Sequence, residues 1–308
     1  MKLAFLFPGQ GAQYVGMGKE LYETYPEAFE AMESAQLDFD LKQLMFEGTE
    51  EELGKTQYTQ PALVAVELAI AKILNDLGIK AEATAGLSLG EYAALSYAGA
   101  FDGKTAVELV ATRGRLMEEA VPAGIGAMTA VLGLEADKLK EACERVQGHG
   151  IVEIANYNCP GQMVIGGHLP AVEEAGRLAL ELGAKRAIPL KVSGPFHTSL
   201  LKEAGSQLRQ ELEKVQLGAL QIPVFYNATG DSETVDLVDN LEKQIQSSVY
   251  FEKSIRKMME SGIDAFIEVG PSKTLSGFVK KIDRKAKVYN VEDMESLNKV
   301  VEAVKGRA

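Results

Sequence analysis

Residues 84–95, TAGLSLGEYAAL, place Ser88 between Gly86 and Gly90. A short apolar stretch that favours a strand comes directly before the serine, and a helical pattern follows it. G-x-S-x-G in a strand–turn–helix context is the pattern of a nucleophile elbow, whose glycines permit strained dihedrals and close packing of strand against helix. A serine that merely caps the helix is the alternative. The stretch predicts an α/β fold with Ser88 beyond the carboxyl end of a strand.

Strand and helix patterns alternate on both sides of this turn. Short strands are expected near residues 3–7, 82–87, 222–227 and 264–269. Helices are expected over roughly 16–35, 61–77, 102–120, 198–214 and 237–259, and after Gly270-Pro271. Pro61 is expected in the first turn of its helix. The alternation indicates a mainly parallel sheet flanked by helices, an α/β-hydrolase-like core.

Residues 125–195 have a different pattern, because the expected elements follow the order strand, helix, strand, strand, helix, strand. This order matches the ferredoxin-like split motif. We therefore expect an inserted ferredoxin-like α+β subdomain over 125–195. The α/β core would then consist of 1–124 and 196–308.

Composition limits the possible functions and locations. The chain has 308 residues, 46% of them hydrophobic, and a formal net charge of −12, which argues against a general affinity for nucleic acid or anionic membranes. Cys143 and Cys159 form no CxxC motif and are interpreted as free thiols in a reducing cytoplasm. The apolar run at the start is too short for a signal peptide, and no stretch is long enough to span a membrane. The histidines lack metal-ligand spacing, so neither a metal nor a cofactor is expected.

A nucleophilic serine needs a general base, and the chain offers three histidines. His149 lies between two glycines and His168 precedes a Leu-Pro helix start, so both are interpreted as surface or capping residues. His197 lies in 192–200, VSGPFHTSL, between an expected strand and an expected helix, and a helix N-terminus favours a neutral imidazole. A buried or capping histidine remains the alternative. No acidic residue stands out as its partner, and a backbone carbonyl could orient the ring instead.

Arg113 falls on the apolar stripe of the helix expected over 102–120, beside Val110 and Met117, whereas Arg115 falls on its outer face. An inward guanidinium keeps its charge and must meet an anion. That anion is either an internal aspartate or glutamate, or a carboxylate or phosphate of the substrate.

The glycine-rich opening 7–18, FPGQGAQYVGMG, does not form a dinucleotide-binding loop, because Tyr14 occupies the third glycine position of G-x-G-x-x-G. Neither Gly-Lys pair of the chain completes a phosphate-binding motif. What remains is a turn after the first strand that presents Gln10 to the same crevice as Ser88.

These features together resemble the malonyl-CoA:acyl carrier protein transacylases of type II fatty acid synthesis. The similar motifs run along nearly the whole chain: FPGQGAQ at 7–13, TQPAL at 59–63, GLSLGEYAAL at 86–95, RGRLMEEAVP at 113–122, NYNCPGQMVIGG at 156–167, GPFHTSLL at 194–201, PVFYNATG at 223–230 and EVGPSKTL at 268–275. The chain departs from the family at Leu87, where many members have histidine, and at Ser248, where proline is frequent.

The resemblance implies a role for each matching residue. Ser88 would be the acylated nucleophile, His197 its base, and Arg113 the group that binds the malonyl carboxylate. The amides of Gln10 and Leu89 would form the oxyanion hole. Other implied residues are Gln60, Asn156 and Asn158, which would line the cleft, Phe196, typical of members that prefer malonyl over branched units, and Gln244, whose main-chain oxygen would orient the histidine. The difference at position 248 leaves Gln246 as the alternative orienting residue.

The implied reaction is transfer of malonyl from malonyl-CoA to the phosphopantetheine thiol of acyl carrier protein, by ping-pong kinetics. Three alternatives stay open: a serine hydrolase or thioesterase, an extender-unit acyltransferase of polyketide synthesis, and a non-catalytic scaffold. The basic run 279–287 is either a solvated helix face or a docking patch for the acidic carrier protein, formed by Lys280, Lys281, Arg284, Lys285 and Lys287. Lys185 and Arg186 are a second candidate patch.

Overall fold

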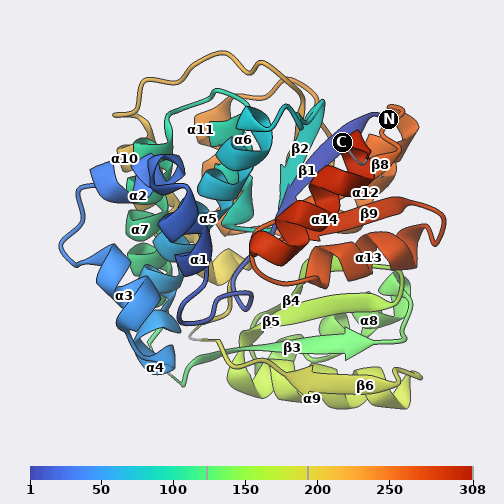
Figure 1. Cartoon of the computed structure of the whole chain (residues 1–308). Helices are drawn as coiled ribbons and strands as arrows, with labels where there is room; N and C mark the ends of the chain where they lie inside the picture. The colour runs from blue at the N-terminus through green and yellow to red at the C-terminus, as the bar shows by residue number, and fades with distance from the viewer. Residues whose placement is uncertain (123, 193, 307–308) are drawn as a thin grey trace.

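A computed structural model describes residues 1–122, 124–192 and 194–306 of the chain. Its larger sheet has five strands in the order β7-β2-β1-β8-β9, and every pair in it is parallel (Figure 1). The strands are β1 Leu3–Phe7, β2 Ala83–Gly86, β7 Val224–Phe225, β8 Ala265–Val269 and β9 Lys287–Val291. The parallel sheet expected from the alternating pattern is therefore present.

Strand β1 shows why this sheet is covered on both faces. All five of its residues are buried, with Phe5 and Phe7 in one hydrophobic cluster and Ala4 and Leu6 in another. Residues of α5 Thr56–Asp76, α6 Gly90–Tyr97, α7 Gly103–Glu119, α10 Lys202–Leu212, α11 Leu237–Ile245 and α14 Met294–Lys305 belong to the first cluster. Residues of α12 Phe251–Glu260 and α13 Thr274–Ile282 belong to the second. Two-sided burial explains the continuous apolar run of the strand.

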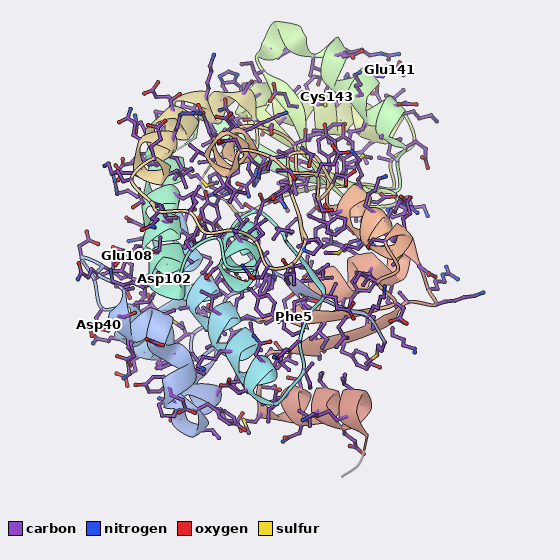
Figure 2. All side chains as sticks on the ribbon, turned by 90° about the horizontal axis from the view of Figure 1, so that it is seen from above. Phe5, Asp40, Asp102, Glu108, Glu141 and Cys143 are labelled. Carbon is purple, nitrogen blue, oxygen red and sulfur yellow. The ribbon has the colours of Figure 1, made fainter. Side chains whose placement is uncertain are left out.

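A second sheet of four antiparallel strands, in the order β4-β5-β3-β6, is built from the middle of the chain. Its elements in chain order are β3 Gly126–Leu132, α8 Ala136–Arg145, β4 Val152–Cys159, β5 Gln162–His168, α9 Leu169–Glu181 and β6 Arg186–Pro189. Both helices pack on it around a separate hydrophobic cluster. Figure 2 shows Glu141 and Cys143 of α8 far from Phe5 of the main sheet.

The antiparallel sheet is joined to the rest of the molecule along β4. The amide of Tyr157 donates to the carbonyl of Val249, and the amide of Val249 donates to the carbonyl of Ala155, each at 2.8 Å. The rings of Tyr157 and Tyr250 stack with their centroids 5.1 Å apart. The chain segment between α11 and α12 is thus held against this edge of the sheet.

Two predictions about the N-terminal helices were wrong. The helix expected over 16–35 is broken into α1 Lys19–Thr24, the 3-10 helix η1 Pro26–Phe29 and α2 Glu30–Ser34. Tyr25, which precedes a proline, has φ −132° and ψ 60°, because the proline ring disfavours a helical conformation before it. Pro61 lies inside α5 and not in its first turn, since the helix starts at Thr56.

Several short or terminal elements were not predicted: α3 Leu41–Glu47, α4 Glu50–Leu53, β9 and α14. The basic run 279–287 is not one helix face, because α13 ends at Ile282 and β9 begins at Lys287. The last strand expected within 125–195 is limited to Arg186–Pro189, and Ser193 lies outside the described residues. Within the described ranges, no helix is long and apolar enough to cross a membrane.

Candidate active site

Ser88 lies in the turn between β2 and α6, at the carboxyl edge of the parallel sheet, and is half-buried. Its φ of 57° is in the left-handed region, which is costly for a residue with a side chain. A Cβ atom at Gly86 would lie 1.9 Å from the carbonyl carbon of Gly90, and one at Gly90 would lie 2.2 Å from the carbonyl oxygen of Phe7. Both glycines are therefore required by the close packing of strand, turn and helix.

His197 contacts the serine directly. Its Nε2 atom lies 2.7 Å from Ser88 Oγ, and its Nδ1 atom lies 2.8 Å from the main-chain oxygen of Gln244. Since a carbonyl oxygen only accepts, Nδ1 carries the hydrogen and Nε2 is free to accept the serine proton. Gln246 does not take this position, because the main-chain oxygen that contacts Nδ1 is that of Gln244. The structure thus brings together a hydroxyl, an imidazole and a backbone carbonyl.

The imidazole is kept neutral. His197 is 4% exposed and also has a left-handed φ, 59°. Burial, and then the charge of Arg113, lower the pKa of His197 to about 3. The ring can therefore act as a proton acceptor across the physiological pH range.

Arg113 is fully buried on α7, as its place on the apolar stripe predicted. Nη1 donates to Oε1 of Gln60 at 2.7 Å, and Nη2 donates to Oε1 of Gln244 at 3.0 Å and to Ser88 Oγ at 3.1 Å. The guanidinium carbon lies 5.5 Å from the centroid of the Tyr92 ring. Both direct protein partners other than the serine are neutral amides.

No internal aspartate or glutamate among the described residues contacts Arg113 directly, although the buried Glu91 is close enough to interact with its charge. Among the described residues, no carboxylate forms an ion pair with this guanidinium, and its Nε atom is buried without a hydrogen-bond partner. Burial lowers the pKa of Arg113, and the nearby Tyr92 and Glu91, which interact with its charge, oppose this effect. An unpaired buried donor on a cation is the feature expected of a binding site for an anion.

Two backbone amides stand close to the turn of the serine. Leu89 directly follows Ser88, and the loop after β1 that contains Gln10 packs against it: a Cβ atom at Gly9 would lie 2.8 Å from the carbonyl oxygen of Leu87. Within the described part of the chain, neither the Gln10 amide nor the Leu89 amide donates to a protein acceptor. The side chain of Gln10 donates to Oγ1 of Thr56 at 3.2 Å. Free amides beside a nucleophile can stabilise an oxyanion.

The remaining expected residues lie at different distances from this centre. Gln60 contacts Arg113 directly, and Phe196 is buried next to His197 in the chain. Asn156 and Asn158 lie on β4 with exposures of 9% and 6%, and in the described part of the chain no hydrogen bond joins either of them to the serine or the arginine. Oδ1 of Asn158 is buried without a partner. The structure thus brings Gln60 into contact with the arginine and places the two asparagines on β4, a strand of the second sheet.

Sequence reasoning missed three buried polar residues around the serine: Glu91, Asn227 and Asn240. The side chain of Asn227 contacts the backbone at the elbow, and Glu91 accepts hydrogen bonds from both asparagines. Burial raises the pKa of Glu91 to about 7, against the effect of these bonds. The signal that could have found them is the polar Asn227 at the end of an apolar strand pattern, and Glu91 on an otherwise apolar helix.

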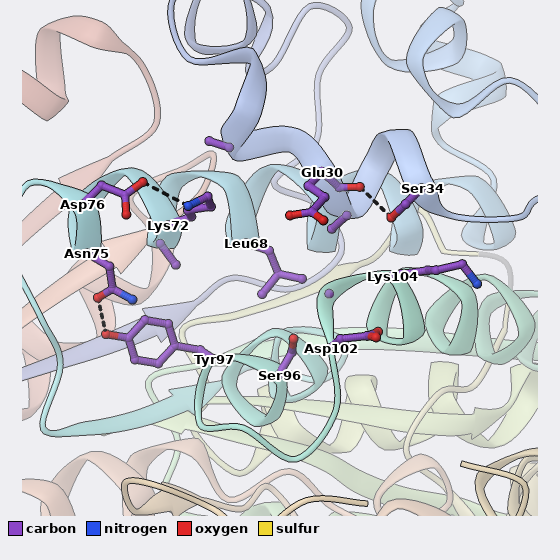
Figure 3. Close-up of a pocket in the computed structure, with 14 residues that line it drawn as sticks. Glu30, Ser34, Leu68, Lys72, Asn75, Asp76, Ser96, Tyr97, Asp102 and Lys104 are labelled. Carbon is purple, nitrogen blue, oxygen red and sulfur yellow. Dashed lines mark hydrogen bonds and ion pairs between the residues drawn. The ribbon is translucent and has the colours of Figure 1, made fainter. Parts of the chain in front are cut away.

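The other candidate sites have fewer features that indicate a function. His168 accepts from the amide of Ile151 at 2.9 Å, and no cluster of potential metal ligands occurs in the described ranges. A hollow of 520 Å³ is lined by residues of α2, α5, α6 and the start of α7, among them Glu30, Lys72, Tyr97 and Lys104 (Figure 3). Its lining includes neither the serine nor the arginine, and Lys72 and Tyr97 are already bonded to Asp76 and Asn75.

Known proteins share this fold and much of the sequence. A family model described as "Acyl transferase domain" matches residues 4–303. The malonyl CoA-acyl carrier protein transacylase of Bacillus subtilis is 47% identical over 309 residues, covering 99% of this chain and 98% of the relative. The crystal structure of the Clostridium perfringens enzyme of that name is 45% identical, with a TM-score of 0.95 and coverage of 99% and 98%. A malonyl-transacylase solved in complex with a type II PKS acyl-carrier protein is 39% identical, with a TM-score of 0.95 and coverage of 98% and 100%.

Proposed function

Since the chain belongs to the acyl transferase domain family, and within it to the malonyl-CoA:acyl carrier protein transacylases, we propose that it transfers malonyl from malonyl-CoA to the phosphopantetheine thiol of an acyl carrier protein, for fatty acid synthesis. The observation that carries the proposal is the hydrogen bond from buried Arg113 to Ser88, because it joins a nucleophile to a cation whose Nε has no hydrogen-bond partner and which no carboxylate among the described residues contacts directly. Homologues named for this activity, one of them in complex with a carrier protein, support it.

The first half-reaction forms an ester. Ser88 Oγ attacks the thioester carbonyl of malonyl-CoA while its proton passes to Nε2 of His197. The carbonyl oxygen becomes an oxyanion, and the amides of Gln10 and Leu89 stabilise it by about 3 kcal/mol each. The carbon–sulfur bond then breaks, the imidazolium returns the proton to the CoA sulfur, and CoA leaves as a thiol.

The malonyl carboxylate binds Arg113. Nε and Nη2 lie on one side of a guanidinium and suit a bidentate carboxylate, and Nε is free. When the carboxylate accepts a hydrogen bond from Nη2, it replaces the bond from Nη2 to Ser88 Oγ, and this oxygen becomes free to attack the thioester. Because the charge of Arg113 is one of the causes that lower the pKa of His197, a bound carboxylate also makes the base stronger.

The second half-reaction reverses the first with a different sulfur. The thiol of the carrier protein gives its proton to His197, the sulfur attacks the ester carbonyl, and Ser88 leaves with that proton. Gln244 holds the imidazole in one orientation through both steps by accepting from Nδ1. Gln60 and Gln244 hold the guanidinium, and Phe196, Asn156 and Asn158 are proposed to line the cleft.

We further propose that residues 125–195 form a ferredoxin-like subdomain, inserted in an α/β-hydrolase-like core made of 1–124 and 196–308. The order β-α-β-β-α-β and the strand order β4-β5-β3-β6 support the first part. The strand–elbow–helix at Ser88 supports the second. Cys143 and Cys159 are buried free thiols, which supports a reducing compartment such as the cytoplasm.

The proposal is tested by a two-step mass measurement. Purified protein is mixed with malonyl-CoA, and the peptide containing Ser88 is expected to gain the mass of a malonyl group. Holo-acyl carrier protein is then added, and the malonyl mass is expected to move to the carrier. Ser88→Ala should gain nothing. Adduct loss to free malonate at the same rate without the carrier would support a hydrolase instead, and no adduct with the wild type would refute the proposal.

A further inference from the structure

The strained backbone of Ser88 is held by a side chain from a distant part of the chain. The Ser88 amide donates to Oδ1 of Asn227 at 2.7 Å, and Nδ2 of the same asparagine donates to the carbonyl of Gly86 at 2.6 Å. Asn227 follows β7, the strand that pairs with β2. One side-chain amide therefore bridges Gly86, the last residue of β2, and Ser88 in the turn that follows.

This asparagine is itself fixed by buried contacts. Its backbone amide donates to Oε2 of Glu91 at 2.7 Å, and the side chain of Asn240 donates to Oε1 of the same carboxylate at 2.9 Å. Its carbonyl accepts from the amide of Tyr250 at 2.9 Å. Glu91, Asn227 and Asn240 are 0%, 1% and 5% exposed. Glu91 stands in the first turn of α6, where a carboxylate also interacts favourably with the helix dipole.

The bridge also decides which amide is available for catalysis. The Ser88 amide is occupied by Asn227, whereas the next amide, that of Leu89, has no acceptor among the described residues. Holding Ser88 at a φ of 57° sets the direction of the following peptide group. The same contact thus fixes the position of Oγ and the direction of one oxyanion donor.

We propose that Asn227, supported by Glu91, is a positioning residue that keeps Ser88 in its reactive conformation. This inference rests on the proposed function of Ser88 as nucleophile. The Asn227 side chain does not bond to the Ser88 hydroxyl; its two short hydrogen bonds are to the backbone of the elbow, and Nε2 of Gln244 donates to its Oδ1 over a longer distance, 3.5 Å. Loss of Asn227 should lower the rate of acylation more than the affinity for malonyl-CoA, because Asn227 does not contact Arg113 and meets its partner Gln244 only through a long 3.5 Å hydrogen bond.

Asn227→Ala is the test variant, and Asn240→Ala is the matched control. The control loses a buried hydrogen bond to the same carboxylate but no contact with the elbow. Asn227→Ala is expected to lower the acylation rate constant about 100-fold, the usual cost of misplacing a reacting group by about 1 Å. Asn240→Ala is expected to change it less than about tenfold at a similar loss of melting temperature. Equal effects of the two variants on acylation would overturn the proposal.

One further variant and one further measurement separate the positioning role of Asn227 from the proposed function of Ser88. Asn227→Asp retains the acceptor for the Ser88 amide and is expected to keep more activity than Asn227→Ala, and the reverse order would count against the bridge. Labelling of Ser88 by phenylmethylsulfonyl fluoride is measured in parallel, since it needs a reactive serine but no malonyl group. If the wild type is labelled by this reagent and not by malonyl-CoA, the proposed function fails while the labelling ratio of the variants still tests the positioning role.

Discussion

Nη2 of Arg113 donates a hydrogen bond to Oγ of Ser88 over 3.1 Å. The guanidinium is fully buried, its other direct partners are the amide oxygens of Gln60 and Gln244, and its Nε is unsatisfied. A neutral acyl group would leave this cation as it is, whereas a malonyl carboxylate would supply the missing ion pair. We propose that the selectivity for a dicarboxylic thioester comes from this missing ion pair, which the carboxylate of the substrate would complete.

The low basicity of His197 gives the first prediction. Because burial and the charge of Arg113 lower the pKa of His197 to about 3, its ring resonance should not shift in NMR spectra between pH 8 and pH 5. Assignment comes from the resonance that His197→Gln removes. Arg113→Gln should raise the pH at which the resonance moves, since it removes one of the two causes. A midpoint near the ordinary value of 6.5 in the wild type would refute this account.

A buried carboxyl group outside the site gives the second prediction. Glu67 is fully buried with both oxygens unpartnered, and burial, with a smaller effect of Glu268, raises its pKa well above the ordinary value. The unfolded chain then holds fewer protons than the folded one above the unfolded pKa, so stability falls as pH rises.

Glu67→Met removes this pH-dependent cost while keeping a similar volume. We expect it to stabilise the protein, with an advantage that grows by up to about 1.4 kcal/mol per pH unit between the unfolded and folded pKa values. Urea denaturation at pH 5, 6 and 7 measures it, with exposed Glu82→Met as the control. A variant that is less stable than the wild type at all three pH values would contradict the prediction.

The carrier protein docking surface gives the third prediction. Lys280 and Lys281 are exposed, although Nζ of each also bonds within the chain, to the carbonyl of Ala286 and to Oε1 of Gln162. With Arg284 and Lys285 they remain the proposed docking patch. Charge reversal by Lys280→Glu and Lys281→Glu should raise KM for the acidic carrier protein several-fold and leave acylation by malonyl-CoA unchanged.

The second candidate patch serves as the comparison. Lys185→Glu with Arg186→Glu, at the start of β6, removes the same charge from another exposed part of the chain. If this pair raises KM for the carrier and the first pair does not, docking belongs to β6 instead. Equal loss of both half-reactions in either double variant would indicate a general structural effect.

Local sequence patterns were enough to predict the residues whose location follows from the periodicity of one strand or one helix. Ser88 was found from its glycines and flanking elements, and Arg113 from the period of its helix, because burial follows directly from that period. The Arg113 partners Gln60 and Gln244 come from two other helices, 53 and 131 residues away. The residue-level resemblance named these two, but no local pattern joins them.

The Asn227–Glu91 contact shows more clearly which contacts cannot be predicted from local sequence patterns. It links residues 136 positions apart, and each residue alone reads as an ordinary polar exception in an apolar segment. The boundary errors have a local origin instead: Pro61 is tolerated inside α5, and Pro26 breaks the expected first helix. The short strand β9 was missed because it begins at Lys287, within a basic segment that has no strand-like apolar pattern.

The most direct test of the central claim compares acyl-enzyme formation from malonyl-CoA and acetyl-CoA in the wild type, Arg113→Ala and Arg113→Lys. The wild type should strongly favour malonyl, because acetyl leaves the buried guanidinium unpaired. Arg113→Ala should lower malonyl transfer by at least about 100-fold and reduce the malonyl/acetyl ratio towards one, and Arg113→Lys should restore it only in part. A ratio that stays unchanged in Arg113→Ala would contradict the claim that this guanidinium selects the substrate.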